Sequence, residues 1–447
     1  MLIRPRLLLS LCLWCGISAP GLRAEELAPG PGAAPPERLE VREGWLAAQQ
    51  LFRLPPWMEL GLEFTAEPLG NPSGGLTQQS NWMQQTTATL AVGSGLAKSI
   101  DTWSEADHWR VNLTLNHYSG DPNYAAQIGA QFPLQQVAFP DGFWLSEVSV
   151  ARELGEGWFG VKGGIVPLNP DFVAAPIFDY YVHSALNNTL NITLNDLPIS
   201  PFAATGAIAT LRPAADLTLR YGAFNLNSVV PIAQWLGVDP LVPPGNGWAQ
   251  LLQLTYSPAW LAPKAETPLQ ACRTAAGLRT VQSGCAKPVT VQRQLPAGLI
   301  QVGGYSTPEQ GNGLYGTVSW GMPSPLGLDT RFWVGGQLSP EAGNGSDAGS
   351  DDIDVSPYFI GGGLVTQGLL PGRPLDVFIL GVGRSGINGA LLGLSQNGYE
   401  AMVEVGYQLQ LNQTLALQPT LQWIVNPGGS GDLSGIFAAG VQISLTF

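Results

Sequence analysis

The residues that could do chemistry in this sequence are single charged side chains set into short apolar stretches. Glu147, Lys162, Arg220 and Glu404 each lie near the middle of a segment in which apolar residues alternate with polar or small ones. Alternation with a period of two puts the two sets on opposite faces of a β-strand, so these charges share the polar faces of their strands. Carboxylates and cationic groups on such faces can exchange hydrogen bonds with a polar solute.

Two arginines, Arg110 and Arg331, occupy polar faces nearer the ends of their segments. Alternatively, charges of this kind only bind water and stabilise the wall that carries them. The sequence therefore leaves a contact role and a bracing role open for each of these charged residues.

Patterns that would indicate catalysis are weak. His108, His117 and His183 show neither the spacing of a metal site nor that of a hydrolytic triad. The G-x-G-x-x-G at 381–386 follows an apolar run, but the helix and second parallel strand of a dinucleotide site do not follow it. We therefore predict a protein that is not an enzyme and needs no cofactor.

Two groups of residues admit a structural or a metal-binding interpretation. Cys272 and Cys285 lie close in the sequence and most simply form one disulfide in an exported chain, with a metal site as the alternative. The acidic loop 339–354 could bind Ca²⁺, but its residue order does not match an EF-hand. A solvated acidic loop is the simpler interpretation, and we predict no metal site.

Composition favours many short elements broken by turns. The chain has 447 residues, of which 56 are Gly and 37 are Pro, and only 12% are charged. Outside the N-terminus, no apolar run is long enough for a membrane-spanning helix. The formal net charge of −13 disfavours nucleic acid as a partner.

The N-terminal residues are expected to direct export. Residues 1–24 combine a basic start with a short apolar centre and a cleavage point after Ala24, as in a secretory signal. A short transmembrane anchor is the alternative interpretation. Residues 25–56 are expected to form a periplasmic Pro- and Gly-rich linker with a possible short helix at 38–53.

Alternating segments continue through the rest of the chain. We predict sixteen strands, at 58–66, 86–93, 109–118, 144–152, 158–166, 204–212, 216–224, 248–256, 298–305, 314–320, 330–338, 355–363, 375–383, 399–410, 414–425 and 436–447. The last of them alternates strictly and ends on an aromatic residue. An even number of strands, several of them near ten residues long, is what a closed antiparallel barrel in a membrane requires.

The connections between these segments are long and short in turn. If both ends of the barrel chain are periplasmic, long extracellular loops alternate with mostly short periplasmic turns. The connections 94–108 and 257–297 are exceptions, and the second would form a periplasmic excursion carrying the cysteine pair. The predicted fold is all-β, a 16-stranded antiparallel transmembrane β-barrel over 57–447. A soluble β-sandwich or propeller is the alternative, because alternation alone does not separate them.

Several stretches resemble one family. Residues 399–447 are similar to the C-terminus of the OprB-type carbohydrate-selective porins, most specifically over Leu417–Gly429, and Glu404 and Tyr407 match an acid and a tyrosine of that family. Four upstream stretches fit the same pattern: Asn71–Gly75, Trp144–Glu147, Lys162–Phe172 and Leu295–Tyr305. The resemblance covers nearly all of 50–447, and the 257–297 excursion and the acidic loop depart from it.

The resemblance implies a bacterial outer-membrane barrel through which small neutral saccharides diffuse passively. A non-selective or cation-preferring porin, and an enzyme or adhesin displayed on the barrel, are the alternatives. Loop 167–203 is the best candidate for the constriction, and we expect Asp179, Tyr180 and Tyr181 to contact the sugar. A loop that folds outside the pore and is packed by its own aromatic residues is the other possibility.

The family also implies partners at the membrane. We expect outer-membrane lipid around the wall, and an outer-membrane assembly machinery that reads the C-terminal end, here Phe447. The sequence leaves the oligomeric state open between a monomer and a homotrimer.

Overall fold

The structure is a computed structural model. It describes residues 38–39, 54–55, 57–94, 108–155, 157–187, 197–237, 246–261, 269–274, 277–280, 288–291, 295–308, 311–323, 328–339, 356–371, 373–388, 398–411 and 414–446. The signal sequence, most of the linker, Cys285, the acidic loop and Phe447 lie outside this set. The predictions made for them stay predictions.

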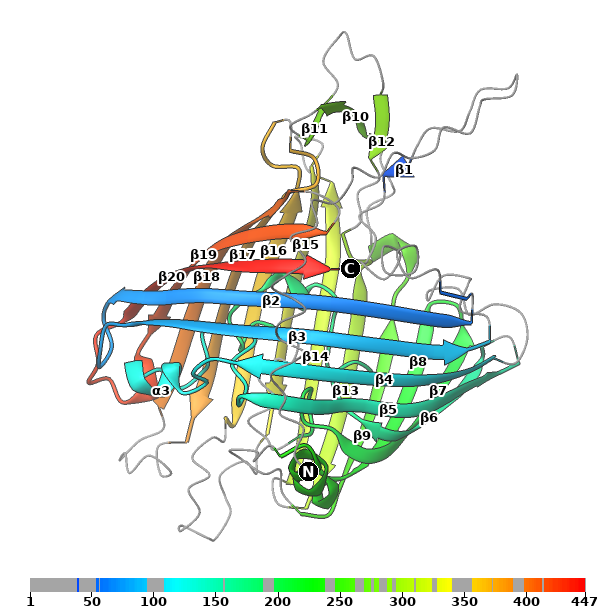
Figure 1. The fold of residues 1–447 in the computed structure, drawn as a ribbon. Helices are drawn as coiled ribbons and strands as arrows, with labels where there is room; N and C mark the ends of the chain where they lie inside the picture. The colour runs from blue at the N-terminus through cyan, green and yellow to red at the C-terminus, as the bar shows by residue number, and fades with distance from the viewer. Residues whose placement is uncertain are drawn as a thin grey trace, which may run out of the picture. The chain divides into compact units, whose positions relative to one another are not determined.

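Sixteen antiparallel strands form one closed barrel. Each strand pairs with its neighbours in the sequence, and β20 pairs with β2 to close the wall, as the red and blue strands in Figure 1 show. The first eight are β2 (Met58–Ser73), β3 (Ser80–Gly93), β4 (His108–Ser119), β5 (Gly142–Leu154), β6 (Phe159–Val166), β7 (Ala204–Ala214), β8 (Leu217–Asn225) and β9 (Trp248–Tyr256). The others are β13 (Leu299–Thr307), β14 (Gly311–Pro323), β15 (Asp329–Leu338), β16 (Tyr358–Gln367), β17 (Val377–Ile387), β18 (Gly398–Gln410), β19 (Leu415–Val425) and β20 (Ile436–Thr446).

Short helices lie in the connections. They are α3 (Tyr124–Ile128), η1 (Phe178–Tyr180), η3 (Leu226–Ser228), α4 (Val229–Trp235), η4 (Ala259–Leu261) and η5 (Pro427–Gly429). Among the described residues, no helix has the length and apolar character needed to cross a membrane. We call the barrel end at which β20 ends and β2 begins the terminal rim, and the opposite end the loop rim.

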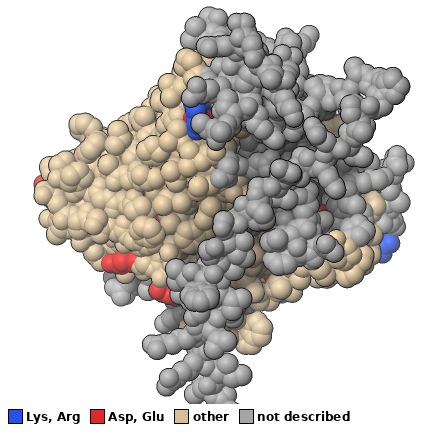
Figure 2. All heavy atoms as spheres, turned by 45° about the horizontal axis from the view of Figure 1, so that its top comes forward, with Lys and Arg blue, Asp and Glu red and all other residues tan. Residues whose placement is uncertain are grey.

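The two faces of each strand differ as the alternation predicts. On β19, Trp423 is 56% exposed whereas its neighbour Gln422 is 1% exposed, because one faces outward and the other faces the interior. The described part of the outer surface in Figure 2 carries few charged side chains. An apolar outer face over a polar inner one is the arrangement that lipid around a wall demands.

The barrel interior differs from the expectation of a polar lumen. Phe172, Phe178 and Leu186 from the connection after β6 are buried in one cluster with inward residues such as Ile379 and Val365. Inward apolar residues on β16 and β17 are stable there because this connection covers them and removes them from water. The interior of a barrel thus contains a hydrophobic core built by a loop.

The sixteen predicted strands coincide with the observed ones to within a few residues, except at the first hairpin. The prediction of a long loop at 67–85 is wrong, because β2 and β3 continue and leave only 74–79 between them. Pro68 lies within the ladder opposite Trp82, and the Asn71 side chain closes the turn by donating to the Thr77 carbonyl at 2.7 Å. Pro and Gly in this stretch had indicated a loop.

A second, small sheet accompanies the barrel. It pairs β1 (Arg38–Leu39), β12 (Pro288–Val291), β10 (Leu269–Thr274) and β11 (Gly277–Thr280) in the order β1-β12-β10-β11. The helix expected at 38–53 therefore does not begin at Arg38, which starts a strand. The excursion 257–297 contains three of these strands and places Cys272 on β10, whereas Cys285 lies outside the described residues.

Candidate functional site

Loop 167–187, the described first part of the predicted 167–203 loop, crosses the barrel interior. It leaves β6 at the loop rim, and its backbone is then bonded to side chains on β8, β9 and β13 and later to side chains on β18 and β19. These strands lie far apart around the wall. The loop therefore occupies the lumen instead of folding outside it.

The near side of the loop is fixed at residues 171–174. The Asp171 carbonyl accepts from Arg220 Nη1 at 3.2 Å, and the Val173 amide donates to Gln253 Oε1 at 2.8 Å. Val173 has a φ of 66°, which is strained for a β-branched side chain and costs on the order of 1–3 kcal/mol. This strained turn keeps Asp171 directed at the wall.

Asp171 meets a charged cluster on the wall. Its carboxylate lies 2.6 Å from Lys162 Nζ, and the same ammonium lies 3.4 Å from Glu147 Oε1. The Lys162, Glu147 and Asp171 side chains are 17%, 14% and 21% exposed, so all three still face solvent inside the barrel. Ser149 donates to the same oxygen, Glu147 Oε1, at 2.5 Å and helps to fix the carboxylate.

The far side of the loop is held by Glu404 on β18. Its two carboxylate oxygens accept from the Val182 and His183 amides at 2.8 and 2.7 Å, and the group is fully buried. The carboxylate thus satisfies two backbone donors that would otherwise be unpaired away from water. Gln418 on β19 adds a third bond by donating to the Tyr180 carbonyl at 2.8 Å.

Tyr181 anchors the same stretch through its ring. Its hydroxyl accepts from Trp333 Nε1 at 2.8 Å and donates to the Leu380 carbonyl at 3.0 Å, and the side chain is buried. The rings of Tyr181 and Phe178 both meet Trp333 edge-on, with centroids 5.7 and 4.9 Å away. Such edge-to-face packing adds to the burial of each ring.

His183 is neutral in this position. Its ring is fully buried, and burial lowers the pKa of His183 to about 3. Nδ1 accepts from the Ala185 amide at 3.2 Å, and Nε2 has no hydrogen-bond partner among the described residues. The ring stays neutral because a charge on it would be shielded from solvent, and a proton on Nδ1 would also break the bond from the Ala185 amide.

A second loop, 120–141, also enters the barrel and was not predicted to do so. Glu400 accepts from the Gln131 and Phe132 amides at 2.8 and 3.2 Å, and Glu67 accepts from the Val137 amide at 3.3 Å. The two loops are bonded to each other, since Ser184 donates to the Pro133 carbonyl at 2.7 Å. The constriction is therefore a two-loop structure that buried wall acids hold.

The other predicted contact residues lie in different surroundings. Asp179 is exposed, Tyr180 is half-buried and Tyr181 is buried as an anchor. Arg331 is buried on β15, where it pairs with Asp329 and donates to the Pro296 carbonyl. The structure brings Glu147, Lys162 and Arg220 together around Asp171, and places Glu404 away from them beneath the loop.

Some residues of this site had no clear signal in the sequence. Gln253 holds the loop, yet its only sign in the sequence is a polar residue that follows Ala249 and Leu251 on the inner face of β9. Asp171 lies within the predicted loop, but nothing in the sequence ranks it above its neighbours. The partner that each acid finds depends on a loop far away in the sequence, which periodicity does not report.

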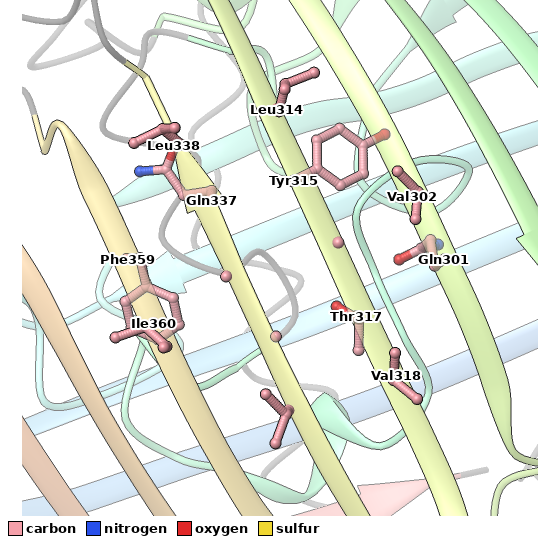
Figure 3. Close-up of a pocket in the computed structure, with 14 residues that line it drawn as sticks. Gln301, Val302, Leu314, Tyr315, Thr317, Val318, Gln337, Leu338, Phe359 and Ile360 are labelled. Carbon is pink, nitrogen blue, oxygen red and sulfur yellow. The ribbon is translucent and has the colours of Figure 1, made fainter.

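One hollow near the described strands is on the outer face and does not belong to this site. Figure 3 shows it over β13 to β16. Its volume is about 490 Å³, and its lining includes outward apolar residues such as Leu314, Leu338 and Ile360. Among the described residues, no group of His, Cys, Asp and Glu is arranged to hold a metal ion.

Comparison with protein families gives one match. The model of the carbohydrate-selective porin, OprB family, matches residues 103–447. A search of curated proteins found no match.

Three solved structures share the fold of this chain. The high-pH structure of Pseudomonas putida OprB matches with a TM-score of 0.66 and 16% identity, covering 93% of this chain and 100% of that one. The low-pH structure of the same protein gives 0.52 and 12%, covering 90% and 97%. A Salmonella typhi OmpF complex with daunomycin gives 0.51 and 8%, covering 87% and 97%. At these identities the likeness concerns the fold.

Proposed function

Since the chain belongs to the OprB family of carbohydrate-selective porins, which places it in the bacterial outer membrane as a saccharide-preferring porin, we propose that small neutral saccharides diffuse passively past loop 167–187 and contact the Lys162 cluster. The observation that carries the proposal is the 2.6 Å contact between Asp171 on the loop and Lys162 on the wall. This contact joins the obstruction to a charged surface that solvent still reaches.

The balance of charge supports a neutral solute. Three carboxylates and three cationic side chains follow one another around the wall and the adjoining loop: Glu59, Arg110, Glu147, Lys162, Asp171 and Arg220. Paired charges leave little net field to attract an ion. They still offer donors and acceptors to hydroxyl groups, and loose contacts of this kind allow release as well as entry.

A non-selective or cation-preferring porin is one alternative, and an enzyme or adhesin on the barrel is the other. Neither has a specific contact in its favour among the described residues. A channel role fits the family and the fold, and catalysis is not part of the proposal.

Swelling of liposomes that contain the purified protein tests the proposal. Liposomes in an isotonic sugar solution should swell faster than those in an amino acid of equal size, because the hydroxyl groups of the sugar make loose, neutral contacts with the paired donors and acceptors. Equal rates would contradict sugar preference, and absence of any swelling or conductance would contradict the channel itself.

A further inference from the structure

The charged cluster at the constriction continues as a connected arc of polar side chains toward the terminal rim. Ser149, which donates to Glu147, accepts from Asn112 Nδ2 at 3.1 Å. Asn112 Oδ1 accepts from Arg110 Nε at 2.6 Å, and Arg110 Nη2 lies 3.3 Å from Glu59 Oε2. We call Glu59, Arg110 and Asn112 the rim group.

The wall is shaped to let this group form. Glu59 on β2 and Asn112 on β4 both lie opposite Ala91 of the intervening strand β3, and Arg110 lies opposite Gly93. The small residues on β3 leave the guanidinium free to reach across that strand to Glu59. A longer inward side chain at either position would fill the space that Arg110 crosses.

The rim group carries hydrogen-bonding capacity that none of the described residues uses. The Glu59 side chain is only 7% exposed, and its Oε1 has no hydrogen-bond partner among the described residues. Buried carboxylate oxygens are ordinarily satisfied, because burial without a partner costs free energy. The Arg110 side chain is 19% exposed, so solvent in the lumen reaches the group.

We propose that Glu59, Arg110 and Asn112 form a second saccharide subsite, next to the Lys162 cluster and nearer the terminal rim; the inference rests on the proposed sugar passage. The group presents a carboxylate acceptor, a guanidinium donor and an amide that does both, so vicinal hydroxyl groups find complementary partners. Arg110 and Asn112 lie two residues apart on the same face of β4, so their backbone positions are about 6.7 Å apart. A sugar that leaves the cluster passes directly to this set without full rehydration.

Sided current-block measurements on single channels in a planar bilayer test the proposal. Glucose is added from one side at a time, and the residence time of each block is measured for the wild type and Arg110→Gln. Arg373→Gln is the matched control, because Arg373 is also ion-paired near the terminal rim, with Asp376 at 2.7 Å, but lies outside the arc. Retention of folded mobility on an unheated gel checks that each variant forms the barrel.

The expected result is a residence time about 2- to 10-fold shorter in Arg110→Gln, the change that loss of one net hydrogen bond gives. Asn112→Ala should shorten it as well, and serves if Arg110→Gln does not fold. Arg373→Gln should match the wild type. Unchanged residence in Arg110→Gln and Asn112→Ala, or an equal fall in Arg373→Gln, overturns the second subsite while leaving sugar passage intact. Absence of block in the wild type overturns both proposals.

Discussion

Glu147 and Glu404 are both inward-facing acids near the middle of a strand, yet the two walls that carry them differ. Glu147 faces solvent within the barrel and pairs with Lys162 at 3.4 Å. Glu404 is fully buried and accepts two loop amides. We call β5, β6 and β8 the contact wall, and β18 with β19 the anchoring wall. The difference teaches that a lumen acid can serve the solute or the loop, and that the loop decides which.

The largest expected effect comes from breaking the anchoring wall. Glu404→Ala removes the acceptor of the Val182 and His183 amides, and hydrogen bonds to charged groups contribute about 1.5–3 kcal/mol each. The loop should leave its place, so that single-channel conductance becomes larger and noisier and sugar block weakens at least about tenfold.

Glu147→Ala is the comparison for that variant. It removes an acid from the contact wall without freeing a loop amide, so it should weaken sugar block while the conductance stays as quiet as in the wild type. Steady wild-type conductance in Glu404→Ala would contradict the anchoring role.

A smaller effect is expected from the contact wall. Lys162→Met keeps the aliphatic stem and removes the charge that pairs with Glu147 and Asp171. Sugar block should weaken about tenfold, which corresponds to about 1.4 kcal/mol. The unpaired carboxylates should also shift the reversal potential in a KCl gradient toward cation preference. An unaltered reversal potential together with unaltered block would remove Lys162 from the site.

The effect that is smallest near neutral pH comes from acidification. Burial lowers the pKa of His183 to about 3, against 6.5 for a solvated histidine, so the displaced loop binds a proton in this window when the seated loop does not. Falling pH below 6.5 therefore favours displacement by at most about 1.4 kcal/mol per pH unit, down to about pH 3.

Channel noise between pH 7 and pH 4.5 measures this effect. Another ionisable group lies at this site, because Glu404 accepts from the His183 amide, so His183→Gln isolates the histidine by difference. Noise should rise more steeply with acid in the wild type than in His183→Gln. Identical pH profiles would show that the seated loop does not exclude the proton.

The sequence predicted the wall better than the interior. Alternation located all sixteen strands, because the contrast between lipid and lumen is repeated at every second residue. It also grouped Glu147 with Lys162 and Arg220 on inner faces. It could not distinguish Glu147 from Glu404, since both sit in the same kind of alternating segment and differ only in which part of the 167–187 loop reaches them.

The two inserted loops were the hardest feature to predict. Phe172, Phe178 and Leu186 are typical of a loop packed on itself, whereas inward apolar residues such as Ile379 are their partners inside the barrel. Ile379 lies within the predicted strand 375–383, but Val365 lies just beyond the predicted end of its strand at 363. Apolar residues on both faces of a predicted strand are therefore the signal to seek for inserted loops.

A structure of the protein with a bound small saccharide shows most directly which wall the sugar contacts. We expect a sugar ring within hydrogen-bond distance of Lys162 and Asp171, with loop 167–187 still bonded to Glu404. A sugar bound against β18 and β19 in place of the loop, with the Lys162 cluster empty, would contradict the division into a contact wall and an anchoring wall.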